Sequence, residues 1–327
     1  MEFRRAGASG LHISTVAYGN FLTHGDKIDA DRSTEIVRAA VDVGITTFDT
    51  ADSYAGGAAE EVLGAALRGL PRDSFELSTK VFFALDDADP HPNSRGLSRK
   101  HVRESIDASL QRLGTDYLDV YIAHRFDPDV PLEEIIQGFA DVVRAGKALY
   151  FGISEWPAEQ IRLAAPIARE LAVPIVLNQV QYSMLSRRAE SDVVAACIES
   201  GIGLWAWSPL QQGVLTGKYL PGQQPPPGSR AVDTGRGSQL IRRWLTDDIL
   251  AAVQKLGALA AELDVPLARL ALAWVLGRTG VSGLIAGGAR PEQVAQNVKA
   301  VELVIPSDVL VRIDEILVGV EPLPVGS

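Results

Sequence analysis

The feature of this sequence that most constrains its fold is a regular alternation of short apolar runs with longer segments of helical periodicity. Eight such runs occur, and their apolar residues are continuous instead of alternating with polar ones. Continuous apolar character is typical of parallel strands that are buried on both faces. The expected strands are residues 15–18, 45–48, 75–79, 118–122, 149–153, 175–177, 202–206 and 281–285.

Segments with apolar residues at helical spacing follow nearly all of these strands. They lie at residues 31–43, 59–70, 98–113, 132–145, 157–171, 191–200, 249–263 and 267–276. Two short runs around Gly7 and Gly10 predict a β-hairpin over residues 3–14. An α/β pattern of this kind predicts a closed (β/α)8 TIM barrel with an N-terminal β-hairpin and long loops at the C-terminal face.

The length of 327 residues would allow two domains, but no internal linker forces a division, and an α/β barrel commonly has this size. We therefore expect a single domain over residues 1–327. An open doubly wound sheet would carry a glycine-rich phosphate turn after its first strand, which Tyr18-Gly19-Asn20-Phe21 does not supply. Residues 211–237 are rich in glycine and proline and are expected to form an irregular, mobile loop over the site.

Charge and composition exclude several classes of partner. The formal net charge is −10, whereas nucleic acids and anionic membranes are bound by basic surfaces. A local cluster of cations for a phosphate group remains compatible with this charge. The single cysteine, Cys197, excludes an internal disulfide and suits a reducing compartment. No signal-peptide pattern follows Met1 and no apolar run could span a bilayer, so we expect a cytoplasmic protein.

Polar side chains stand where the expected strands end. In barrel enzymes this end of the strands carries the active site. The positions are Asp49, Lys80, His124, Ser154, Asn178, Gln179 and Ser208. His24, His91 and His124 lack the spacing of metal ligands, so no metal site is expected.

Asp49, Tyr54, Lys80 and His124 form a set suited to proton transfer at a carbonyl group. The Asp49–Lys80 pair is expected to be charge-neutral and to lower the pKa of the Tyr54 phenol from about 10. Tyr54 could then protonate a carbonyl oxygen that His124 orients. The set contains no nucleophile, so a hydride must come from a cofactor. The alternative interpretation is a purely structural ion pair between Asp49 and Lys80.

The sequence resembles the aldo-keto reductase superfamily over essentially its whole length. The motifs that carry the resemblance are Gly44-Ile45-Thr46-Thr47-Phe48-Asp49-Thr50-Ala51-Asp52-Ser53-Tyr54, Ser78-Thr79-Lys80, Tyr121-Ile122-Ala123-His124, Gly152-Ile153-Ser154 and Trp207-Ser208-Pro209-Leu210. Two further motifs are most similar to the branch that contains potassium-channel β subunits and their bacterial relatives. These are Arg95-Gly96-Leu97-Ser98-Arg99-Lys100-His101 and Arg125-Phe126-Asp127-Pro128.

The resemblance implies a catalytic tetrad of Asp49, Tyr54, Lys80 and His124, with Tyr54 as proton donor or acceptor. It also implies bound NADP(H), with the nicotinamide carboxamide held by Ser154, the residue after it and Gln179, and the ring stacked on Trp207. The pyrophosphate would lie against Ser208, Pro209, Leu210, Gly213 and Lys218. The adenosine end would lie against Gly287, Gly288, Arg290, Gln293, Gln296 and Asn297.

Three positions depart from the pattern of the family. Glu155 stands where many members carry asparagine, and Ala289 stands where a basic or hydroxyl residue often lies near a 2′-phosphate. Gln296 replaces the usual glutamate near adenine, while Arg290 can still pair with a 2′-phosphate, which favours NADPH over NADH. His124 is retained where mammalian channel subunits carry asparagine, which favours a working reductase.

The sequence therefore predicts an NADP(H)-dependent reductase that converts an aldehyde or ketone to an alcohol, with Tyr54 as general acid. The small-molecule carbonyl substrate would lie in an apolar pocket made by Phe21, Phe82, Phe83 and Phe126. The alternative is a nucleotide-binding regulatory subunit with little turnover. A metal-dependent barrel hydrolase or isomerase would need ligands that the sequence does not assemble. The sequence specifies neither the physiological substrate nor the oligomeric state.

Overall fold

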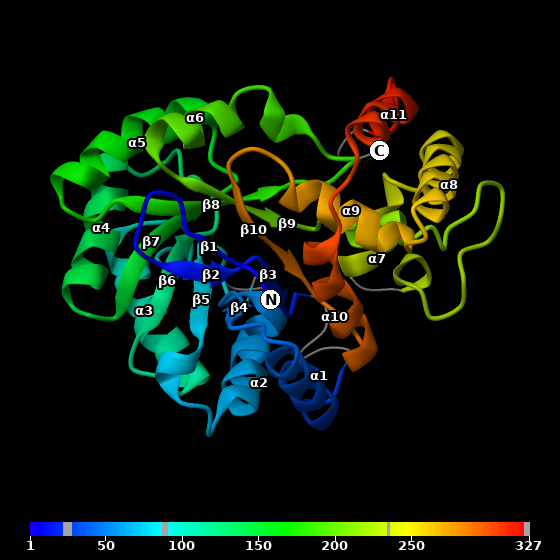
Figure 1. Ribbon diagram of the computed structural model, residues 1–327. Helices are drawn as coiled ribbons and strands as arrows, with labels where there is room; N and C mark the ends of the chain where they lie inside the picture. Colours follow the sequence, from blue (N-terminus) through cyan, green and yellow to red (C-terminus); the bar gives the residue numbers. More distant parts are fainter. Residues whose placement is uncertain (22–27, 87–90, 234–235, 324–327) are drawn as a thin grey trace.

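The computed structural model describes residues 1–21, 28–86, 91–233 and 236–323. Eight parallel strands form a closed barrel, which confirms the predicted TIM-barrel fold (Figure 1). The strands β3 and β10 close the barrel, with Ala17 opposite Ile285. In chain order the barrel strands are β3 (Val16–Gly19), β4 (Thr47–Asp49), β5 (Glu76–Val81), β6 (Leu118–Ala123), β7 (Ala148–Ser154), β8 (Ile175–Gln181), β9 (Gly203–Trp207) and β10 (Val281–Ala286).

The predicted N-terminal hairpin is also present, as β1 (Phe3–Arg5) and β2 (His12–Ser14) in antiparallel pairing. Ile13 is fully buried in a cluster with barrel residues that include Ile122 and Trp205. Gly7 lies in the hairpin turn with φ +56°, and a Cβ there would lie 2.4 Å from the Gly201 carbonyl oxygen. Because Gly201 precedes β9, the hairpin covers the amino ends of the strands and leaves their carboxyl ends for the site.

Six helices each follow one barrel strand and lie around the barrel (Figure 1). They agree with the predicted helices to within a few residues, because each has an apolar face that packs on the strands. They are α1 (Ala30–Asp42), α2 (Ala58–Leu67), α3 (Arg99–Leu113), α4 (Leu132–Arg144), α5 (Ala158–Glu170) and α6 (Val193–Ser200).

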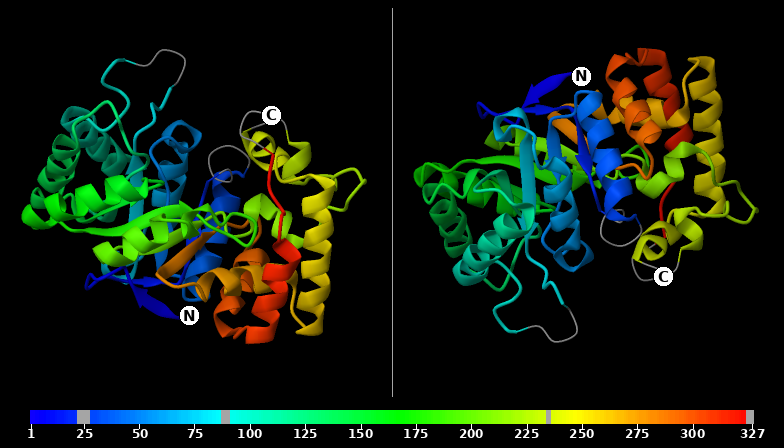
Figure 2. Two further views of the ribbon diagram at one scale, coloured as in Figure 1. Left: turned by 90° about the horizontal axis from the view of Figure 1, so that it is seen from above. Right: turned by 90° about the horizontal axis from the view of Figure 1, so that it is seen from below.

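The described residues after β9 contain five more α-helices. Those predicted are α8 (Asp247–Glu262) and α9 (Leu267–Leu276), whereas α7 (Arg236–Arg242), α10 (Pro291–Val298) and α11 (Ser307–Leu317) were not. Figure 2 shows α8 and α11 side by side at one edge of the molecule, where Arg312 donates two hydrogen bonds to Glu262. Within the described residues, no helix is both long enough and apolar enough to cross a bilayer.

The prediction that residues 211–237 lack regular structure was wrong at the two ends of the segment, whereas residues 217–229 form no helix or strand. The described part of this segment contains the 3-10 helices η4 (Gln211–Thr216) and η5 (Arg230–Val232), and α7 begins at its end. Val214 and Leu215 are fully buried in the main core, and this anchors the segment despite its glycine and proline content. Residues 234 and 235 lie outside the described residues, as does His24.

One strand end also differs from the prediction. Strand β8 continues to Gln181, so Asn178 and Gln179 lie inside it. The extension occurs because β9 pairs along it as far as Gln181, which lies opposite Trp207. Successive strand residues face opposite sides, and Asn178 accordingly points away from the site and contacts the Cys197 sulfur.

Candidate active site

A buried ion pair between Asp49 and Lys80 lies at the centre of the candidate site. Asp49 ends β4 and lies opposite Ser78 in β5, so Lys80, two residues further on, faces the same side. Lys80 Nζ donates to Asp49 Oδ2 at 2.7 Å and to the Thr50 carbonyl oxygen at 2.6 Å. The exposed fraction of Lys80 is 1% and that of Asp49 is 4%, so each buried charge is stabilised mainly by the opposite charge of its partner instead of by water.

The second carboxylate oxygen of Asp49 is held by two further side chains. Ser78 Oγ donates to Oδ1 at 2.8 Å, and Gln179 Nε2 donates to the same oxygen at 2.7 Å. Three side chains from two other strands therefore fix the carboxylate, which gives the ion pair a single geometry. The bond from Gln179 also links the predicted carboxamide contact directly to the ion pair.

Tyr54 is the third member of this cluster. It begins the 3-10 helix η1 (Tyr54–Gly57), where Ala55 and Gly56 have positive φ angles and turn the chain sharply before α2. The ammonium of Lys80 donates to the Tyr54 hydroxyl oxygen at 3.2 Å. Burial raises the pKa of Tyr54 above its ordinary value, and the charge of Lys80 only partly opposes this.

The expectation that the phenol of Tyr54 would be more acidic than usual was therefore wrong. The predicted effect of Lys80 on the pKa has the right sign. However, removal of the phenolate from water destabilises it by more than the charge of Lys80 stabilises it. Burial also acts to lower the pKa of Lys80, yet the negative charge of Asp49 and the contact with Tyr54 raise it overall. Lys80 is thus a cation and Tyr54 a neutral phenol near neutral pH.

His124 and Phe21 lie against Tyr54, and two further predicted pocket phenylalanines lie beyond His124. The rings of Tyr54 and His124 are 5.8 Å apart between centroids, and Phe21 lies 4.8 Å from Tyr54. Phe83 lies 5.1 Å from His124 and packs in turn on Phe82. The ring of the fourth, Phe126, packs against buried Trp156 at 5.2 Å.

Arg125 is a cation at this site that was not among the predicted site residues. Its Nη1 donates to the His124 carbonyl oxygen and, at 3.4 Å, to Ser154 Oγ. Its guanidinium lies 5.7 Å from the Phe83 ring centroid, and its charge acts to lower the pKa of Tyr54. Only the motif that resembles the channel-subunit branch contained it, so its direct adjacency to His124 was the available signal.

The chain directly after β9 has unusual backbone geometry. Ser208, Gln211 and Gln212 all have positive φ values, followed by Gly213 at φ +92°. Ser208 Oγ accepts hydrogen bonds from both the backbone and the side-chain nitrogen of Gln212. Non-glycine residues rarely adopt this conformation, and such strain concentrates at ligand-binding segments.

Three cations lie close together beside this strained segment. A Cβ on Gly213 would lie 3.6 Å from Lys218 Nζ, which places the ammonium over the glycine. Partial burial lowers the pKa of Lys218, and the charges of Arg230 and Arg290 lower it further. Arg230, which donates to Gln212 Oε1, was missed because a single arginine in a proline-rich segment gives no pattern. Mutual repulsion among these three cations favours an anionic occupant.

The predicted adenosine contacts lie after β10. A Cβ on Gly287 would lie 2.8 Å from the Gly19 carbonyl oxygen, so this position requires glycine. Asn297 Nδ2 donates to the Gly287 carbonyl oxygen, and Gln293 Oε1 accepts from the Ala289 nitrogen. These contacts hold the turn itself, whereas Gln296 and Arg290 are exposed to solvent.

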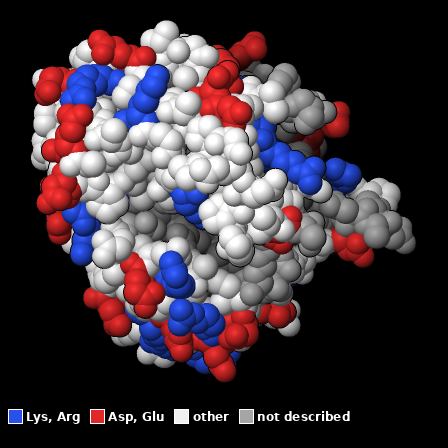
Figure 3. Space-filling view, turned by 90° about the vertical axis from the view of Figure 1, so that its right-hand side faces the viewer, with Lys and Arg blue, Asp and Glu red and all other residues white. Residues whose placement is uncertain are grey.

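The cation cluster and the glycine positions fit a dinucleotide with a pyrophosphate and an additional phosphate. Cationic side chains lie where phosphates would bind, and the aromatic ring of Trp207 lies where a flat ring would bind. The fully buried Gln211 also has a side-chain nitrogen without a hydrogen-bond partner in the described structure. Figure 3 shows the side on which this segment lies: the middle is hollowed and mostly uncharged apart from a small blue patch of Lys or Arg, and charged residues of both signs lie at its margin.

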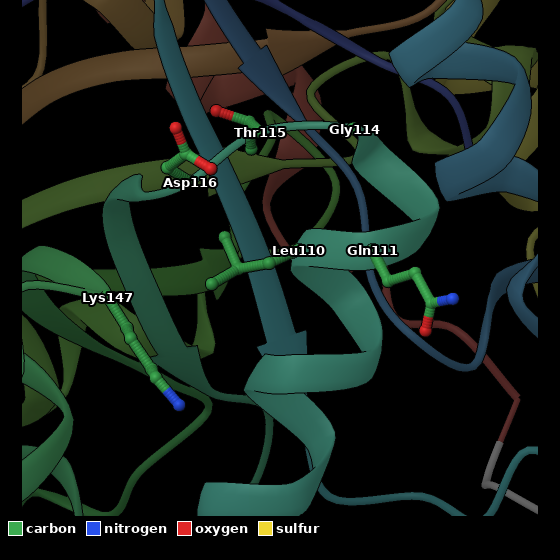
Figure 4. Close-up of a pocket in the computed structure, with 6 residues that line it drawn as sticks. All are labelled: Leu110, Gln111, Gly114, Thr115, Asp116 and Lys147. Atoms are coloured by element: carbon green, nitrogen blue, oxygen red, sulfur yellow. The ribbon is translucent and has the colours of Figure 1, made fainter.

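A separate surface pocket lies at the opposite end of the barrel. Leu110, Gln111, Gly114 and Thr115 at the end of α3, together with Asp116 and Lys147, line it. Figure 4 shows that these residues come from the segments that lead into β6 and β7. The amino ends of the strands contribute mainly to stability in such barrels, so we do not assign the chemistry to this pocket.

Comparison with known proteins agrees with this geometry. The Aldo/keto reductase family matches residues 15–318. A "Probable voltage-gated potassium channel subunit beta" of Arabidopsis thaliana is 40% identical over 93% of this chain and 92% of its own length. The protein of the same name from Oryza sativa subsp. japonica is 39% identical over the same shares of the two chains.

A third relative is the "Putative voltage-gated potassium channel subunit beta" of Schizosaccharomyces pombe. It is 40% identical over 97% of this chain and 93% of its own length. The family match extends over all eight barrel strands, from β3 to β10. The chain therefore belongs to the aldo/keto reductase family, whose members are oxidoreductases that generally bind NAD(P)H.

Proposed function

We propose that this protein is an NADP(H)-dependent reductase that converts an aldehyde or ketone to an alcohol, within a single barrel domain over residues 1–327. The observation that carries the proposal is the position of Lys80 Nζ, which donates to both Asp49 Oδ2 and the Tyr54 hydroxyl. Burial keeps Tyr54 protonated at neutral pH, and Lys80 provides a cation beside the phenolate that proton donation leaves behind.

The residues act in the following roles. When bound, the reduced nicotinamide supplies a hydride to the carbonyl carbon. Tyr54 donates its hydroxyl proton to the carbonyl oxygen as negative charge develops there, and Lys80 stabilises the resulting phenolate. His124 orients the carbonyl oxygen beside Tyr54. Asp49 holds Lys80 in place and balances its charge.

The cofactor would be held along the carboxyl ends of the strands. Ser154 and Gln179 would contact the carboxamide, and Trp207 would support the ring. The pyrophosphate would lie near Ser208, Pro209, Leu210, Gly213 and Lys218, with Arg230 as an additional cation. The adenosine would lie near Gly287, Gly288, Gln293, Gln296 and Asn297, and Arg290 would pair with a 2′-phosphate, which favours NADP(H) over NAD(H).

The substrate class follows from the aromatic rings that surround Tyr54 and His124. Phe21, Phe82 and Phe83 would give the pocket an apolar wall, to which Phe126 would add a further ring. An aromatic or aliphatic aldehyde would bury its apolar part against these rings and place its oxygen toward Tyr54.

The names of the relatives favour a second candidate function. A nucleotide-binding regulatory subunit would retain the cofactor site and turn over slowly. The retained His124 argues against this alternative, because a subunit without turnover does not need a group that orients a carbonyl oxygen.

Steady-state oxidation of NADPH distinguishes the two candidates. The purified full chain would be assayed with aromatic, aliphatic and sugar aldehydes, with NADH in parallel. Tyr54→Phe tests the proton donor, and Tyr117→Phe, at the opposite end of the barrel, is the matched control. Turnover that requires NADPH and the Tyr54 hydroxyl supports the reductase, whereas tight NADPH binding without turnover supports the regulatory subunit.

A further inference from the structure

A single carboxylate joins the carboxyl ends of three neighbouring strands at the candidate site. Glu155 directly follows β7, and its Oε1 accepts a hydrogen bond from the Trp207 indole nitrogen at 2.8 Å. The same oxygen accepts from the backbone nitrogen of Gln181 at 2.5 Å. Gln181 ends β8 and Trp207 ends β9, so the side chain reaches across one strand to the next.

The backbone of Glu155 is held in the conformation that directs its side chain this way. Its φ is +57°, in the left-handed region that non-glycine residues rarely adopt. Its own backbone nitrogen donates to the Gln179 carbonyl oxygen at 2.9 Å, which fixes the turn against β8. The turn is therefore built on the neighbouring strand, and it places the carboxylate of Glu155, a residue that remains exposed to solvent, on the indole nitrogen.

The contact with a carboxylate changes the electrostatics of the indole ring. A hydrogen bond from N–H to an ionised acceptor is stronger than one to a neutral acceptor and draws the proton toward the oxygen. Electron density on the indole ring rises as a result, and the face of an indole is already the negative part of its quadrupole. The face of Trp207 consequently attracts a cationic group more strongly than an indole bonded to a neutral amide would.

We propose that Glu155 is a positioning residue for Trp207, and that this pair selects the oxidised nicotinamide nucleotide over the reduced one. The inference rests on the proposed function, in which Trp207 supports the nicotinamide ring. That ring carries a positive charge in NADP⁺ and none in NADPH. A neutral asparagine, which many family members carry at this position, would give the indole no such bias.

The bias has a consequence for the direction of the proposed reaction. Stronger binding of the oxidised form favours carbonyl reduction on the protein over alcohol oxidation. It also slows release of NADP⁺ after turnover. Lys80 and Arg125 lie close to Tyr54, and their positive charges would repel a cationic nicotinamide ring. Both are unchanged in all the variants below, so their effect on nucleotide binding cancels in the comparison.

Dissociation constants for NADP⁺ and NADPH test the inference, measured by titration calorimetry on the full chain. Glu155→Gln keeps a hydrogen-bond acceptor for the indole but removes the charge. Glu159→Gln, on the exposed first turn of α5, changes the net charge equally and is the matched control. Trp207→Phe removes the indole N–H and keeps an aromatic face, and the double variant Glu155→Gln/Trp207→Phe completes the cycle.

Glu155→Gln is expected to weaken NADP⁺ binding by about two- to fivefold, with a smaller change for NADPH. Glu159→Gln should leave the ratio of the two constants unchanged, and Glu155→Gln should change that ratio no further in the Trp207→Phe background. An unchanged ratio in Glu155→Gln, or an equal change with and without the indole, would overturn the inference. Failure of the unmodified chain to bind either nucleotide would instead overturn the proposed function on which it rests.

Discussion

The ammonium of Lys80 lies 3.2 Å from the hydroxyl oxygen of Tyr54 and donates a hydrogen bond to it. Because Lys80 is itself neutralised by Asp49 at 2.7 Å, the cluster can hold a neutral phenol without an unbalanced buried charge. When Tyr54 gives up its proton, the adjacent Lys80 ammonium stabilises the phenolate that forms. This relationship leads to the predictions for Lys80 and for the pH dependence that follow.

Lys80→Met should abolish most activity and also destabilise the fold. The variant leaves the Asp49 carboxylate buried without its cation, which costs about 3–5 kcal/mol of unfolding free energy. Removal of the cation beside Tyr54 should lower the rate of reduction by about 100-fold or more. Urea unfolding and single-turnover reduction measure the two effects.

The double variant Asp49→Asn/Lys80→Met separates these two effects. It should recover much of the lost stability, since no unpaired charge remains, but it should recover none of the activity. Recovery of activity together with stability would mean that the ion pair is purely structural.

The pH dependence of reduction should show no loss caused by Tyr54 between pH 6 and 9. Burial raises the pKa of the phenol above its ordinary value of about 10, so the proton donor remains intact over this range. Single-turnover rates at saturating NADPH, followed from pH 6 to pH 9, test this. An alkaline decline centred below pH 9 that disappears in Tyr54→Phe would contradict the assigned pKa direction.

Asp52→Asn should stabilise the protein near neutral pH. Burial raises the pKa of Asp52 well above its ordinary value, and the negative charge of Glu60 adds to this effect, against Arg112 and Lys80. A carboxyl group with a raised pKa in the folded state contributes stability below its unfolded pKa of about 4 and loses it as pH rises. The unmodified chain therefore carries a penalty at pH 7–8 that asparagine avoids.

Thermal melting of Asp52→Asn across pH 4–8 measures this penalty. The gain in melting temperature over the unmodified chain should be largest at pH 8 and should shrink toward pH 4. Asp73→Asn, on an exposed 3-10 turn, provides the control for loss of one surface carboxylate. A gain that is constant with pH would show that ionisation of Asp52 is not its cause.

Arg230→Met should weaken NADPH binding by about tenfold or more, since charge-assisted hydrogen bonds contribute about 1.5–3 kcal/mol. The effect should decline with added salt, and Arg242→Met on α7 should have little effect. The test is a titration at two ionic strengths. Equal losses in both arginine variants would remove Arg230 from the proposed phosphate site.

The barrel and the positions of Asp49 and Lys80 were predictable because both follow from local patterns. Strand ends are marked by a change from apolar to polar residues, so Asp49 and Lys80 could be placed at one end of the barrel from sequence alone. The acidity of Tyr54 could not be predicted in the same way, because its sign depends on how much burial outweighs the charge of Lys80.

Other features depend on contacts between segments that are distant in sequence. Arg230 reaches the cation cluster because Val214 and Leu215 anchor the segment after β9, and no local pattern indicates this. Glu155 was visible only as a departure from the family, and its bond to Trp207 joins residues that are 52 positions apart. These contacts depend on how the folded backbone brings distant segments together, which the residue types alone do not indicate.

The most direct test of the proposed chemistry is a single-turnover measurement with NADPH already bound, comparing the unmodified chain with Tyr54→Phe after addition of an aromatic aldehyde. Tyr54→Phe is expected to bind NADPH with an affinity close to that of the unmodified chain but to reduce the aldehyde at least about 100-fold more slowly. Equal rates of hydride transfer in the two proteins would show that Tyr54 is not the proton donor and would contradict the account.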